Sequence, residues 1–60
     1  MKDSIKVTTE FGPDLIFATV MIENGQATVK DWHMDGRRMY LSELSSEQYQ
    51  LLCNLAENSL

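Results

Sequence analysis

A chain of 60 residues has room for only one small hydrophobic core, and this chain has no cross-link to reinforce it. A domain of this length buries about 60% of the surface that its unfolded chain exposes, so its stability is marginal. Cys53 is the only cysteine, which excludes an internal disulfide, and one cysteine with one histidine cannot form a structural zinc site. We therefore expect a single domain over residues 1–60, completed by close packing, self-association or a partner.

The strongest local signal is the dipeptide Asn24-Gly25, which separates two stretches rich in apolar and β-branched residues. Both residues tolerate positive φ, so they predict a two-residue type I′ hairpin. The register of that hairpin places Val20 opposite Val29 on one face of a sheet.

The strand before this turn is apolar on both faces, which indicates a central strand with a helix on one side. A regular continuation of the hairpin register pairs Phe17 with Trp32 on the second face. The same register places Asp31 opposite Ala18 on the apolar face. A β-bulge near Lys30-Asp31 would relieve that misfit.

A strand is also predicted before the turn Gly12-Pro13-Asp14, because apolar or β-branched residues alternate with polar ones there. The residues on its inward face are Ile5, Val7, Thr9 and Phe11.

The second half of the chain predicts a turn and then a helix. Asp35-Gly36 repeats the turn chemistry and predicts a short fourth strand over residues 37–41. Ser45 and Gln48 match a capping box, apolar residues with helical spacing follow it, and Asn58 is the expected C-cap. The fold class predicted is α+β: an antiparallel meander of three or four strands with one C-terminal helix packed on one face.

Charge and length limit the classes of function. The chain carries nine Asp or Glu against five Lys or Arg, a formal net charge of -4. Proteins that bind phosphate backbones normally cluster Lys and Arg on one face. Arg37 and Arg38 stand beside Tyr40, and such a group can form a platform for bases, but two arginines are few against nine carboxylates. Nucleic-acid binding is therefore the third of our hypotheses.

No residue pattern points to catalysis, a metal or another cofactor, so we expect a protein that is not an enzyme. His33 lies between two carboxylates but has no accompanying nucleophile motif, and we interpret it as a surface histidine near a turn. Cys53 falls on the apolar stripe of the predicted helix, where a free cysteine acts as a small hydrophobic residue.

An interaction surface is the most function-like feature. If the helix covers the face of Val20 and Val29, it leaves large side chains exposed on the other face, and exposed apolar area on a small domain usually marks an interface. Those side chains are Phe17, Met21, Trp32 and Met34. The alternative is that the helix covers them. The acidic candidates for contact with a basic surface are Glu23, Asp31 and Asp35.

Our leading hypothesis is a small acidic binding protein, an inhibitor or accessory factor that occupies a basic or apolar groove on a larger protein. The partner could itself bind nucleic acid. Inhibitors that bacteriophages use against host defences have this size and charge, so we expect an origin of that kind. The second hypothesis is a homodimerising module or small subunit whose open sheet face is closed by another copy.

The longest apolar stretch, residues 15–22, is too short to cross a membrane, and no signal peptide precedes it; we expect a cytoplasmic protein without a membrane partner.

Overall fold

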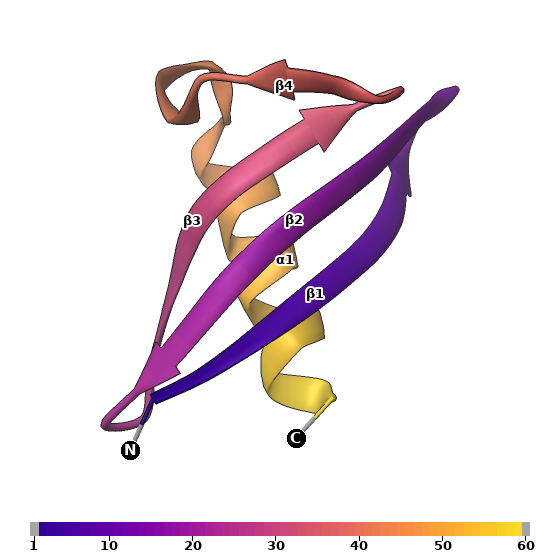
Figure 1. Ribbon diagram of the computed structural model, residues 1–60. Helices are drawn as coiled ribbons and strands as arrows, with labels where there is room; N and C mark the ends of the chain where they lie inside the picture. The colour runs from indigo at the N-terminus through magenta and orange to yellow at the C-terminus, as the bar shows by residue number, and fades with distance from the viewer. Residues whose placement is uncertain (1, 60) are drawn as a thin grey trace.

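The computed structural model describes residues 2–59 and consists of one sheet and one α-helix (Figure 1). The elements in chain order are β1 (Lys2–Phe11), β2 (Asp14–Glu23), β3 (Gln26–Met34), β4 (Arg37–Met39), the 3-10 helix η1 (Leu41–Glu43) and α1 (Ser46–Asn58). The four strands are antiparallel and neighbour one another in the order β1-β2-β3-β4. The predicted α+β fold, a meander with one C-terminal helix, is confirmed.

Local turn and capping chemistry explains where these elements begin and end. Asn24 and Gly25 have φ values of 54° and 78°, as the predicted type I′ turn requires. Ser45 caps α1 in the predicted box: its hydroxyl accepts a hydrogen bond from the Gln48 backbone N–H at 3.2 Å, and the Gln48 side chain accepts one from the Ser45 N–H at 3.2 Å.

A β-bulge in β3 interrupts the β2–β3 ladder. Val20 pairs with Val29 as predicted, but the next residue of β2, Thr19, pairs with Asp31. Lys30 is therefore an extra residue in β3 with no partner in β2. The bulge lies at the position where the sequence suggested one.

The predicted pairing of Phe17 with Trp32 is wrong, and the bulge is the reason. One extra residue reverses the facing of every side chain that follows it. Trp32 consequently lies opposite Ala18 on the face that α1 covers, and Phe17 lies opposite His33 on the other face, which we call the outer face. The same shift places Asp31 on the outer face, where its carboxylate keeps access to water.

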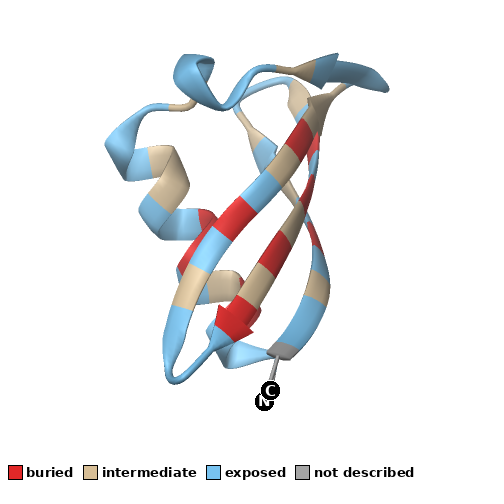
Figure 2. Cartoon of the chain, turned by 60° about the vertical axis from the view of Figure 1, so that its left-hand side comes forward, coloured by how far each residue is buried: buried red, intermediate tan, exposed pale blue. Residues whose placement is uncertain are grey.

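The core lies between α1 and the inner face of the sheet. Buried positions alternate along β2, whereas in β3 the bulge separates the buried Val29 and Trp32 by three positions; α1 lies across the side to which they belong (Figure 2). The buried residues are Val7, Ile16, Ala18, Val20, Ile22, Val29, Trp32, Leu52, Cys53 and Ala56. The inward row predicted for β1 is confirmed as buried or half-buried.

Helix α1 also closes the edge of β3 that the short β4 leaves open. Tyr49 reaches this edge, where its hydroxyl oxygen accepts a hydrogen bond from the Val29 N–H at 3.1 Å. One turn later the Cys53 thiol donates to the Ala27 carbonyl, with sulfur and oxygen 3.6 Å apart. The helix thus supplies partners for backbone groups that β4, three residues long, cannot reach.

Deleting Lys30 is expected to leave the protein folded, because removal of the bulge residue keeps Val29 and Trp32 on the inner face. Deleting Thr28 instead would turn Val29 outward and place Lys30 in the core opposite Val20, so that variant should not fold. Thermal denaturation followed by far-ultraviolet circular dichroism compares the two. Equal destabilisation by both deletions would contradict this account of the register.

Candidate functional site: the Tyr40 corner

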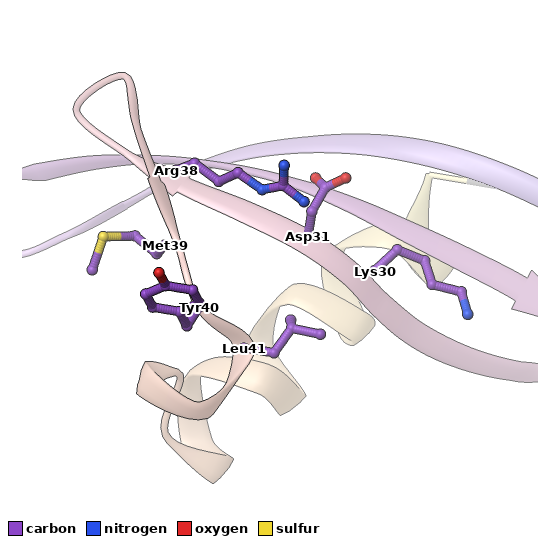
Figure 3. A pocket seen from close by; sticks show the side chains of 6 residues that line it. All are labelled: Lys30, Asp31, Arg38, Met39, Tyr40 and Leu41. Atoms are coloured by element: carbon purple, nitrogen blue, oxygen red, sulfur yellow. The ribbon is translucent and has the colours of Figure 1, made fainter.

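A hollow on the described surface lies where β4 leads into η1 (Figure 3). It has a volume of about 510 Å³ and is open to solvent. We call this surface the Tyr40 corner; it is lined by Lys30, Asp31, Arg38, Met39, Tyr40 and Leu41. Its residues come from β3, β4 and the start of η1, so the β3–β4 hairpin and the turn into η1 together build it.

Two apolar side chains project into solvent at this corner. Both side chains are large: the aromatic Tyr40 is 77% exposed and the aliphatic Leu41 is 46% exposed. Neither packs in the core, since the chain here is leaving the sheet and has not yet entered α1. Exposed side chains of this kind next to a hollow form a surface suited to contact with another molecule.

The backbone under Tyr40 is held in place from inside the protein. The indole Nε1–H of Trp32 donates a hydrogen bond to the Tyr40 carbonyl oxygen at 2.9 Å. Trp32 is only 1% exposed, so its ring is fixed by the core on all sides. A buried indole N–H needs a partner, and here that partner anchors the segment that presents the phenol ring to solvent.

Charged side chains of both signs border the hollow. Lys30 and Arg38 are exposed, and Asp31 is half-buried. The Arg38 and Asp31 side chains point toward one another above β3, while the Lys30 side chain extends along the strand away from them (Figure 3). One carboxylate between two cations leaves this part of the surface slightly positive, in contrast to the acidic chain as a whole.

The outer face of the sheet continues from this corner. A second hollow of about 260 Å³ includes Phe17, His33 and Asp31 in its lining, so the two hollows share Asp31. Phe17 is 42% exposed and Met21 is half-buried on this face, which is where the sequence placed them.

The apolar patch expected from the sequence is nevertheless not formed. Trp32 is enclosed in the core, and Met34, opposite Ile16 on the inner face, packs partly buried against that core. Placing these two residues with Phe17 on an exposed surface was wrong, because the bulge turns both of them inward.

The three acidic candidates do not gather at one place either. Glu23 stands at the β2–β3 hairpin, and Asp35 lies in the β3–β4 turn at the opposite end of the sheet (Figure 1). The Asp35 carboxylate has a structural contact, since its Oδ1 accepts a hydrogen bond from the Leu15 N–H at 3.0 Å. Of the three, only Asp31 belongs to the Tyr40 corner.

The groups that could carry chemistry are dispersed. Cys53 is buried, and burial raises the pKa of its thiol above the usual value, as does the negative charge of Glu57. His33 is half-buried on the outer face, opposite Arg38 of β4. Among residues 2–59 there is no group of three or more His, Cys, Asp or Glu side chains that could hold a metal ion.

From the sequence, Tyr40 was considered only as part of a nucleic-acid platform, and Lys30, Met39 and Leu41 were not assigned to any functional surface. The available signal was the pair Tyr40-Leu41, two large residues that match neither the strand alternation before them nor the helical spacing after them.

No helix in the described part of the chain has the length and hydrophobicity needed to cross a bilayer. Comparison of the chain with protein-family models, with curated proteins and with solved structures yields no match in any of the three.

Proposed function

We propose that this protein is a non-enzymatic binding protein that occupies the surface of a larger protein and makes its central contact through the Tyr40 corner. The observation that carries the proposal is the exposed Tyr40 ring, 77% accessible, on a backbone anchored by the buried Trp32 indole. In this role the protein acts as an inhibitor or accessory factor, because it covers a surface and transforms nothing.

The composition of the corner supports contact with a protein. Tyrosine and arginine are over-represented among the residues that dominate binding energy, and the corner presents Tyr40 and Arg38 beside one hollow. A ring on a pre-positioned backbone loses little conformational entropy on binding. Leu41 adds apolar area next to it.

Charge favours an apolar groove with a basic surround as the partner surface. The centre of the corner presents the Tyr40 ring and the Leu41 side chain, so it suits an apolar pocket. The chain that follows it is purely acidic, since residues 39–59 contain three carboxylates and neither Lys nor Arg. Those carboxylates, Glu43, Glu47 and Glu57, would steer the protein toward a basic surface at low salt.

The substitution Tyr40→Ala tests the proposal. We expect it to weaken binding to the partner by about 2 kcal/mol or more, which is roughly a thirtyfold rise in Kd. The melting temperature should change little, because the side chain is exposed and its carbonyl remains available to Trp32. Proteins captured by the immobilised full chain are identified by mass spectrometry, and the affinity of each variant for the main protein is measured by calorimetry.

Leu51→Ala is the matched control, since it also removes an exposed large apolar side chain but lies on α1. Wild type and Leu51→Ala should bind equally. If Phe17→Ala abolishes binding and Tyr40→Ala does not, the outer face is the contact surface and the assignment to the corner fails. Capture of oligonucleotides in place of a protein would reject the proposed partner class.

A further inference from the structure

Strand β1 has a free edge, and the hydrogen bonds of β2 show which of its backbone groups face outward. The Leu15 N–H donates to the Asp35 carboxylate at 3.0 Å, and the Leu15 carbonyl accepts from the Asp35 N–H at 2.9 Å. Leu15 therefore turns both backbone groups away from its β1 partner, Glu10. Because antiparallel ladders alternate, the N–H and C=O groups of Lys6, Thr8 and Glu10 all point to the free edge.

The two edges of the sheet differ, because one is covered by other elements and the other is open. The β3 side is closed by β4 and by the Tyr49 and Cys53 contacts from α1. The β1 side runs for ten residues, and within residues 2–59 no other strand pairs with its outer edge (Figure 1). A long open edge of this kind is a template for pairing with another strand.

The geometry points to a second copy of this chain as that partner: we propose that β1 pairs antiparallel with β1 of another copy about a two-fold axis at Thr8. In this register Lys6 of each copy lies opposite Glu10 of the other, so two pairs of opposite charge form on the outer face. Lys6 and Glu10 are both exposed. A lysine on an edge strand ordinarily disfavours pairing, but here a carboxylate stands at the symmetric position.

Neighbouring registers lack this complementarity. An axis at Lys6 places the two lysines directly opposite each other, which is repulsive. An axis at Val7 places Lys6 opposite Thr8 and leaves Glu10 opposite Ser4, without any charge pair. Among the registers centred on these three residues, only the one at Thr8 forms pairs of opposite charge without also placing like charges opposite each other.

The inner face is also complementary in that register. Ile5 comes opposite Phe11 of the other copy, and both are apolar residues that the monomer leaves half-buried. Val7 comes opposite Thr9. A two-fold axis perpendicular to the sheet keeps both α1 helices on one side, and it leaves the Tyr40 corner, at the opposite edge, free for a partner.

Exchanging the charges of Lys6 and Glu10 tests the proposed dimer. Sedimentation equilibrium of the wild-type chain from micromolar to millimolar concentration should show conversion to twice the monomer mass. Lys6→Glu and Glu10→Lys each turn two attractive pairs into repulsive ones and should raise the dimer Kd roughly tenfold or more. The double variant Lys6→Glu/Glu10→Lys exchanges the charges and should restore the wild-type Kd.

Lys30→Glu and Glu47→Lys are controls with the same change in net charge away from β1, and they should leave the dimer Kd unchanged. Hydrogen exchange supplies an independent readout: the amides of Lys6, Thr8 and Glu10 should become protected as the concentration rises. The proposal fails if the chain stays monomeric at millimolar concentration, or if the double variant is no better than the single ones. It also fails if Lys30→Glu disrupts the dimer and Lys6→Glu does not, which would place the contact at the Tyr40 corner.

Discussion

Trp32→Ala is expected to leave the protein largely unfolded at room temperature. The indole is 1% exposed and is the largest fully buried side chain, and truncating such a residue costs about 3–5 kcal/mol. A single core in a chain below about 70–80 residues rarely supplies more than about 3–5 kcal/mol in total. The substitution also removes the hydrogen bond that holds the Tyr40 carbonyl, so the corner would lose its anchor together with the core.

Phe17→Ala is the appropriate control for this substitution, because Phe17 is an aromatic residue of the same sheet but is 42% exposed on the outer face. Far-ultraviolet circular dichroism and thermal denaturation should show a folded Phe17→Ala protein and an unfolded Trp32→Ala protein. Trp32→Phe should lie between them, since it keeps an aromatic ring in the core but loses the N–H donor and part of the indole's volume. A Trp32→Ala variant that melts near the wild-type temperature would mean that Trp32 does not belong to the core.

Leu52→Ala is expected to have the second-largest effect on stability, with a loss of about 2–5 kcal/mol. Leu52 belongs to the buried face of α1 that packs in the core, and it has no exposed surface. It has no polar group, so its whole contribution comes from apolar burial and packing. The cavity left by alanine cannot easily close, because the sheet on the other side is held by its hydrogen-bonded ladder.

The neighbouring residue provides the control. Leu51→Ala makes the same chemical change one position earlier on α1, where the side chain is 40% exposed. Urea denaturation should show a midpoint much lower than wild type for Leu52→Ala and close to wild type for Leu51→Ala. Equal midpoints for the two variants would contradict the assignment of the buried face of the helix.

The elements themselves were predictable because their signals are local. Asn24-Gly25 determines a turn through its own backbone preferences, and the same chemistry recurs at Asp35-Gly36, where φ is 51° and 83°. The Ser45 capping box likewise involves only residues within one helical turn. Such interactions form between neighbours in the chain, so they depend little on the rest of the fold.

The candidate site was predictable only in part. Phe17 lies on the outer face as expected, whereas Trp32 was assigned to that face and lies in the core. The bulge at Lys30 decides this difference, and an extra residue in a strand has no signature of its own beyond the misplaced Asp31. The exposure of Tyr40 was not predictable from the sequence either, because it depends on where the chain leaves the sheet.

The sequence by itself therefore determined the turns, the helix start, the meander and the acidic character of this protein. Only the tertiary structure decided which side of the sheet α1 covers, that Trp32 points inward and that Tyr40 points out. The physical reason is that β2 is apolar enough on both faces to suit either side. The choice between them is made by packing between distant residues, through one bulge that places a tryptophan in the core and its neighbouring aspartate on the outer face.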